Sequence, residues 1–133
     1  MIDIESQVYT AVKNVVTASY PNCLCQSTLT LMPASFPTVC IEEVDNYVDP
    51  RGTDSANTEQ LASVVYEVNI YSDAMSGRKA QAKAILKIID DKMNDLGFIR
   101  RTRRPVSLDS AQVYRLVARY AAIVGRDEQI YGR

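Results

Sequence analysis

The sequence predicts an α+β fold in which two helices pack on one face of an antiparallel sheet. Three observations support this fold class. Residues 64–71 alternate between an apolar set and a mixed set, which is typical of a strand with one buried face. Residues 82–96 repeat apolar side chains at helical spacing. Residues 113–125 alternate again, and the links between the later strands are short, which favours antiparallel pairing.

The first part of the chain predicts one helix and two short strands. The helix is expected over residues 3–19, and Tyr20-Pro21 should end it because the residue before proline avoids helical geometry. Its apolar side consists of branched residues, namely Ile4, Val8, Val12, Val15 and Val16. The two strands are expected in 27–32 and 38–44, on either side of a turn that contains two prolines.

The central strand and helix are expected to cover each other. The buried face of the strand consists of Val64, Tyr66, Val68 and Ile70. The buried face of the helix consists of Ile85, Leu86, Ile89, Met93 and Leu96. Lys79, Lys83, Lys87 and Asp90 occupy the opposite side of the helix. Gly97 stands where a left-handed residue is expected to end this helix.

Two further strands are predicted after the helix. Residues 98–106 should form a short strand, because Pro105 cannot donate to a sheet ladder. In the strand at 113–125, alternate residues form an apolar set, and Arg115 and Arg119 point the other way. The inward set consists of Leu116, Ala118, Tyr120, Ala122 and Val124. The polar tail after Gly125 is expected to add a short edge strand or an arm.

Length and charge limit the classes of function. The 133 residues predict a single domain over 1–133, and a net charge of −1 argues against a general nucleic-acid binder. No apolar run approaches the roughly 20 residues that span a bilayer, and the acidic start is unlike a signal peptide. The chain is therefore expected to be made in a cytoplasm, with no membrane partner.

The longest polar stretch predicts a long loop at 45–61. It contains Asp49-Pro50 and Arg51-Gly52 among small polar residues. A loop of this length in a compact domain is usually functional or disordered. A binding role and a mobile, solvated loop therefore both remain open.

Four arginines form the sharpest local charge feature. On a regular strand, Arg101 and Arg103 would share one face, and Arg100 and Arg104 the other. Such a cluster can bind phosphates or the acidic surface of a protein partner. It can also be a solvated strand end balanced by the acids of the preceding helix, which are Asp90, Asp91 and Asp95.

Candidate catalytic and metal-binding groups are few, since the chain has no histidine. Cys23, Cys25 and Cys40, with Asp45 or Glu42 as a fourth ligand, are an alternative zinc site. A single C-x-C without a second pair favours small packing groups instead. Glu42 and Glu43 should point to opposite faces of a strand, and Asp90 and Asp91 should be solvated. We therefore expect no catalytic residue, no cofactor and no metal.

With its elements in this order, the chain resembles the tail terminator (tail completion) proteins of long-tailed bacteriophages. More loosely, it is similar to the small head–tail joining proteins. The resemblance rests on an N-terminal amphipathic helix (IDIESQVYTAVKNVV), a polar loop after the second strand, and the strand YEVNIYS before a helix that ends in Leu-Gly-Phe. An arginine-bearing strand and the final strand YRLVARYAAIVG follow. The family has no catalytic signature.

The resemblance implies a tail-terminator-like fold and a role in the virion rather than catalysis. Similar proteins form rings, commonly hexameric, at the head-proximal end of the tail tube. There they stop tube growth and present a surface to the head connector. The implied partners are the tail tube protein and a connector or neck protein, and DNA passes through the ring lumen.

Charge and loop length, not matched family residues, select the expected interface. It consists of Arg100, Arg101, Arg103, Arg104, Asp49 and Arg51. Two other classes of function remain: a small nucleic-acid-binding module that uses the arginines, and a metal or thiol enzyme built on the cysteines.

Overall fold

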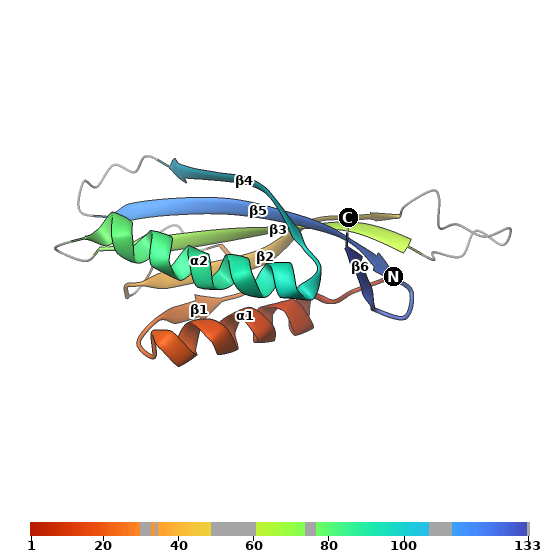
Figure 1. Ribbon diagram of the computed structural model, residues 1–133, viewed down its shortest axis with the longest axis horizontal. Helices are drawn as coiled ribbons and strands as arrows, with labels where there is room; N and C mark the ends of the chain where they lie inside the picture. Colours follow the sequence, from red (N-terminus) through yellow and green to blue (C-terminus); the bar gives the residue numbers. More distant parts are fainter. Residues whose placement is uncertain (30–32, 34, 49–60, 74–76, 107–112, 133) are drawn as a thin grey trace, which may run out of the picture.

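The computed structural model describes residues 1–29, 33, 35–48, 61–73, 77–106 and 113–132. In these residues the chain forms two helices and six strands. Their order is α1 (Glu5–Ser19), β1 (Leu24–Gln26), β2 (Thr38–Val48), β3 (Leu61–Ser72), α2 (Arg78–Leu96), β4 (Ile99–Val106), β5 (Tyr114–Gly125) and β6 (Ile130–Gly132). Figure 1 shows α1 and α2 side by side on the same side of the sheet. The predicted α+β fold, with two helices on one sheet face, is confirmed.

The sheet has the strand order β1-β2-β3-β5-β4, and β6 pairs with β5. All these pairs are antiparallel except β1 with β2, which is parallel. The long strands β3 and β5 lie at the centre and pair along twelve residues each. Neither helix in the described ranges is long and apolar enough to cross a membrane.

Helix α1 ends where the sequence predicts but begins two residues later than expected, at Glu5 rather than at residue 3. The Asp3 carboxylate accepts a hydrogen bond from the Glu5 N–H at 3.1 Å, which satisfies one of the free donors of the first turn. The helix ends at Ser19, immediately before Tyr20-Pro21. Its buried side faces the sheet and α2 and consists of Val8, Val12 and Val16.

The predicted strand at 27–32 is wrong in its described part. Residues 27–29 are not in a strand, and the first strand is β1, just before them. The apolar character of Cys23 and Cys25 explains the difference, because both pack against the core. The Cys25 carbonyl also accepts a hydrogen bond from the Tyr9 hydroxyl at 2.9 Å, which ties β1 to α1.

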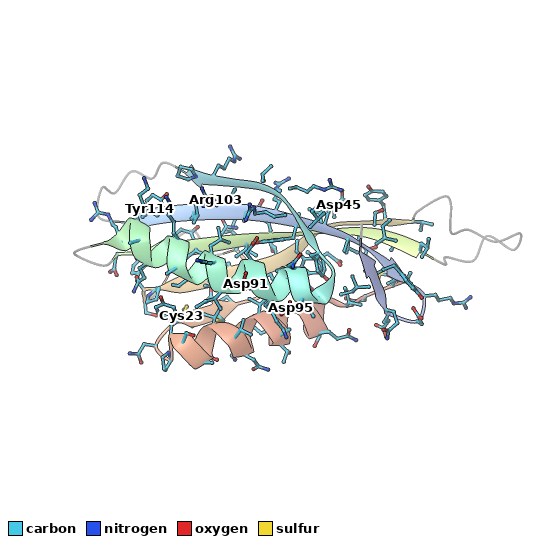
Figure 2. All side chains as sticks on the ribbon, in the orientation of Figure 1. Cys23, Asp45, Asp91, Asp95, Arg103 and Tyr114 are labelled. Carbon is cyan, nitrogen blue, oxygen red and sulfur yellow. The ribbon has the colours of Figure 1, made fainter. Side chains whose placement is uncertain are left out.

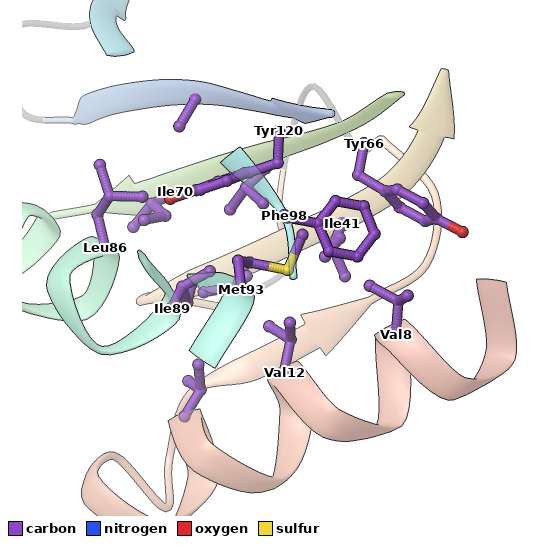
Figure 3. Close-up of a cluster of buried hydrophobic side chains, with 14 of the residues drawn as sticks. Val8, Val12, Ile41, Tyr66, Ile70, Leu86, Ile89, Met93, Phe98 and Tyr120 are labelled. Atoms are coloured by element: carbon purple, nitrogen blue, oxygen red, sulfur yellow. The ribbon is translucent and has the colours of Figure 1, made fainter. Parts of the chain in front are cut away.

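The core lies between the sheet and the two helices, and both predicted alternating strands supply it (Figure 3). The inward residues of β3 are Val64, Tyr66, Val68 and Ile70, all buried. Those of β5 are Leu116, Ala118, Tyr120, Ala122 and Val124, also buried. Helix α2 adds Ala82, Ile85, Leu86, Ile89 and Met93. Each of these predicted faces is confirmed, although Leu96 is only half-buried.

The sequence Leu-Gly-Phe ends α2 as predicted. Gly97 has a φ of 105°, which is a left-handed conformation that side chains disfavour. Its N–H donates to the Asn94 carbonyl at 3.1 Å, and the Phe98 N–H donates to the Met93 carbonyl at 2.9 Å. Met93 and Phe98 also belong to the buried core. This combination is the Schellman motif, and it fixes the direction in which β4 leaves the helix.

The loop predicted at 45–61 is shorter than expected at both ends. Asp45 to Val48 continue β2, and Leu61 already belongs to β3. The reason is local pairing, since these residues form the ends of a β2–β3 ladder in which Val48 lies opposite Ala62. Residues 49–60, including Asp49 and Arg51, lie outside the described residues.

Candidate protein interface

The arginine strand β4 is an edge strand. It pairs with β5 alone in the described sheet, and its residues from Arg100 to Pro105 are exposed. Pro105 sits near its end, where a missing N–H is tolerated at a sheet edge. The strand is eight residues long, so Pro105 does not shorten it as much as expected. Four cationic side chains therefore project from a free edge.

A register shift in β4 changes the predicted distribution of the arginines. The pairing moves from Arg100 opposite Tyr120 to Thr102 opposite Arg119, which leaves Arg101 as the extra residue of a bulge. Arg103 then lies opposite Ala118. Because Tyr120 and Ala118 face the core, Arg100 and Arg103 share the helix side of the sheet.

Arg104 lies opposite Val117, and Thr102 lies opposite Arg119, so both project from the other face. The prediction that Arg101 and Arg103 share one face, with Arg100 and Arg104 on the other, is therefore wrong. Alternation along a strand holds only while the ladder is regular, and one bulged residue inverts every later position.

Arg100 links β4 to α2 through Asp90. Its guanidinium lies 3.0 Å from Asp90 Oδ1, and the Tyr120 hydroxyl donates to the same oxygen at 2.8 Å. Burial, followed by the hydrogen bond to Asp90, raises the pKa of the Tyr120 hydroxyl and keeps it a donor. The expectation that Asp90 is merely solvated is wrong, because its carboxylate accepts hydrogen bonds from Tyr120 in β5 and from Arg100 in β4. Asp91, labelled in Figure 2, is exposed as expected.

Two lysines of α2 join the arginines in one basic surface. Lys83, Leu86 and Lys87 line a shallow depression of about 160 Å³ together with Asp90, Arg100 and Arg103. Four cations thus surround one carboxylate, and that carboxylate is already paired. We call this surface the basic edge, and it consists of Lys83, Lys87, Arg100, Arg101, Arg103 and Arg104.

Most of the basic edge lacks a counter-charge within the described structure. Arg101, Arg103 and Arg104 form no ion pair or side-chain hydrogen bond with any described residue. Four like charges within five residues repel one another unless anions lie nearby. An acidic surface on another molecule would relieve that repulsion, and arginine suits it because its planar guanidinium pairs bidentately with carboxylates.

The opposite edge of the sheet is acidic. On the helix side, the Glu5 carboxylate accepts from the Glu43 N–H at 3.0 Å, and Glu43 itself accepts from the Tyr66 hydroxyl at 3.0 Å. Burial raises the pKa of Glu43, and the nearby Glu5 and Asp3 raise it further. We call this surface the acidic edge, and it consists of Asp3, Glu5, Glu42, Glu43 and Asp45.

The acidic residues occupy both faces of that edge. Glu43 lies opposite the buried Tyr66, so it is on the helix side, and Glu42 lies opposite Glu67 on the other face. The predicted divergence of Glu42 and Glu43 is confirmed. A second register shift, between Glu43 and Asp45, places Asp45 opposite Val65 on the same face as Glu42. Arg103 and Asp45, both labelled in Figure 2, thus lie toward opposite sides of the sheet, on β4 and on the part of β2 that β1 does not cover.

The sequence did not indicate that Asp3, Glu5 and Glu43 come together to form one acidic surface. Asp3 and Glu5 have an ordinary local role near a helix start. Their approach to a strand some forty residues away depends on how α1 packs, as the 2.9 Å hydrogen bond from Asn46 to the Ile2 carbonyl illustrates. The face away from the helices holds another missed pair, in which Arg119 lies 2.9 Å from Glu67.

The three cysteines are free thiols at packing positions. Cys23 and Cys40 are buried and Cys25 is half-buried. A hydrogen bond with Cys25 and burial raise the pKa of the Cys23 thiol. In the described ranges, no group of three or more His, Cys, Asp or Glu side chains is placed to hold a metal ion.

Replacing all three cysteines by alanine is expected to leave the fold intact. Each buried thiol should contribute only about 1 kcal/mol, because the group removed is about the size of one methylene. Thermal melting should therefore show a moderately lower midpoint, and elemental analysis should find no stoichiometric zinc in the parent protein. Zinc in the parent, lost together with folding in the variant, would contradict the packing interpretation.

The fold is similar to that of a chain in the solved structure "Virion of native gene transfer agent (GTA) particle". The TM-score is 0.66, the sequence identity is 15%, and the match covers 92% of this chain and 94% of that chain. At this identity the likeness concerns the fold. No protein-family model and no curated protein sequence matches the chain.

Proposed function

We propose that this protein is a structural component of a phage-like virion. The observation that carries the proposal is the fold likeness to a chain of a gene transfer agent virion, which extends over 92% of this chain and 94% of that one. A match along nearly the whole of both chains means that the same complete unit recurs, rather than a shared fragment. The proposed role is structural and requires no catalysis.

Within the virion, we assign the protein to the head-proximal end of the tail. There it would form a ring, with six subunits as the expected number, that ends tail-tube growth and joins the tail to the head. Its partners would be the tail tube protein on one side and a connector or neck protein on the other. DNA would pass through the lumen without sequence-specific contact. The resemblance described from the sequence and the two oppositely charged edges support this assignment.

Removing the gene from the virus or particle that encodes the chain tests this role. Tails are expected to grow to uncontrolled lengths and to remain unattached to heads, because nothing ends the tube or presents the joining surface. Electron microscopy of the particles would measure both effects, and a wild-type copy supplied in trans should reverse them. Attached tails of normal length in the absence of the protein would contradict the proposed role.

A nucleic-acid-binding module is the second candidate, and it is favoured by Arg101, Arg103 and Arg104, which have no ion-pair partner among the described residues. Phosphate binding by several cations releases counterions and falls steeply with salt. Titration of duplex DNA with the protein at two salt concentrations distinguishes the two candidates. Tight binding with a steep salt slope would favour the module over the ring.

A further inference from the structure

The two free edges of the sheet lie at opposite ends of its strand order. Strand β4 ends one side, and on the other side β1 covers only residues 38–40 of β2. Eight of the eleven residues of β2 (41–48) therefore have no strand on the side away from β3 in the described sheet. Strand β4 also has eight residues. Each edge thus offers eight strand residues, and on the β2 side Glu5 and Ile2 already bond to Glu43 and Asn46.

The two edges carry opposite charges, and on each face of the sheet the cations of one edge have carboxylates as counterparts on the other edge. On the helix side, Arg103 of one edge matches Glu5 and Asp3 of the other. On the far side, Arg104 matches Glu42 and Asp45. If two copies stand side by side with their helices on the same side, cations meet carboxylates on both faces. Such complementarity sets the orientation of a contact and excludes the like-charged alternatives.

The acidic edge also exposes apolar side chains. Val44, Tyr47 and Val48 are 40%, 54% and 46% exposed, and together they form half of the six large hydrophobic residues exposed in the described structure. All three belong to the free part of β2. Tyr47 lies opposite Ser63 on the far face and Val48 opposite Ala62 on the helix side, so exposed apolar groups accompany the acids on both faces of this edge. Apolar groups bordered by charged groups are characteristic of protein interfaces, so this edge has two independent features of a binding surface.

We propose that the acidic edge of one copy binds the basic edge of the next copy, in a head-to-tail contact that repeats around the ring. The contact uses two different surfaces of the same chain, so it generates a closed ring or an open helix rather than a symmetric dimer. This inference rests on the proposed ring and identifies its subunit interface.

Side-chain charges and apolar contacts, rather than a continuous backbone ladder, provide the binding. Both edges carry a bulge, at Arg101 and between Glu43 and Asp45, and bulges interrupt the regular spacing that strand addition requires. The Glu43 N–H is already bonded to Glu5, and Pro105 has no N–H to donate. The bulges and charges also limit indiscriminate edge pairing, which leaves the oppositely charged edge as the favoured partner.

Reversing the charge of each edge separately gives the first half of the test. One variant carries Arg104→Glu and the other carries Glu42→Arg and Asp45→Arg, so both change only the far face and leave Arg103 opposite Glu5 and Asp3. Each variant alone should self-associate about 100-fold more weakly than the parent, because like charges then face each other. Analytical ultracentrifugation over a range of concentrations measures this, and circular dichroism checks the fold. Asp91→Arg with Asp95→Arg, on the exposed side of α2, is the matched control and should associate normally.

Mixing the two variants provides the second half of the test. In an equimolar mixture every junction between unlike copies joins opposite charges, so association should return, and the ring should contain an even number of alternating copies. The chain with all three substitutions should also assemble by itself. Raising the salt concentration should weaken association in the parent and in the mixture.

Each outcome decides the proposal. Normal assembly of either single variant overturns it, as does a folded pair that does not associate on mixing, or a parent that stays monomeric at high concentration. Rings that persist in the single variants would leave the virion role intact while removing these edges as its interface. Open chains with charge-dependent mixing would support the edge contact and contradict the ring.

Discussion

Replacing Phe98 by alanine is expected to destabilise the protein by about 3–5 kcal/mol, a large part of the roughly 5–15 kcal/mol that stabilises a typical domain. The side chain is buried and packs edge-on against Tyr66, with ring centroids 5.4 Å apart and an interplanar angle of 89°. Phe98 and Met93, the two apolar positions of the Schellman motif, both belong to the buried core (Figure 3). Removal of the Phe98 side chain therefore leaves a cavity where α2, β3 and β4 meet.

Urea denaturation followed by circular dichroism measures this effect. Phe98→Leu keeps most of the volume and should cost only about 1 kcal/mol, within the range of shape-conserving core changes. Tyr131→Ala is the surface control, because its side chain is 61% exposed, and it should change stability by about 0.5 kcal/mol or less. A loss below about 1 kcal/mol for Phe98→Ala would show that the surrounding side chains collapse into the space.

Phe98 also connects stability with the proposed interface. It immediately precedes β4, and its backbone N–H holds the end of α2 at the Met93 carbonyl. The position of the arginine strand therefore depends on this buried contact as well as on pairing with β5. Phe98→Ala should consequently weaken self-association even at temperatures where the monomer remains folded.

Elements with strong internal patterns could be predicted from the sequence. The alternation in 64–71 and 113–125, and the helical spacing in 82–96, determined which faces are buried, because apolar area is removed from water only on that side. Gly97 marked a helix end for a local conformational reason that no tertiary contact alters. These features require only the residues of the element itself.

Features that depend on pairing between distant segments could not be predicted. The position of β1 follows from contacts with β2 and α1, and its three residues are too few to show a period. The bulge at Arg101 is a property of the β4–β5 ladder, so the faces of the arginines were assigned wrongly. The acidic edge forms only when α1 reaches β2, which brings Glu5 to the backbone of Glu43.

Asp90 illustrates how one polar residue serves both the core and the basic edge. Its Oδ1 accepts from the buried Tyr120 hydroxyl at 2.8 Å and from the exposed Arg100 guanidinium at 3.0 Å. These two contacts differ in expected strength. An exposed ion pair contributes about 0–1 kcal/mol, whereas a buried hydroxyl left without a partner costs about 1–3 kcal/mol. The buried hydrogen bond should therefore dominate the effect of removing the carboxylate.

A double-mutant cycle tests this expectation. Asp90→Ala should destabilise the protein by about 1–3 kcal/mol, and much less in a Tyr120→Phe background, where no hydroxyl remains to be satisfied. Asp90→Asn keeps an acceptor oxygen and should cost less than Asp90→Ala. Urea denaturation of the four proteins of the cycle gives the coupling energy. Equal costs in the two backgrounds would instead indicate that Asp90 stabilises the protein through its ion pair with Arg100. A double-mutant cycle of Asp90→Ala and Arg100→Ala would then show the coupling.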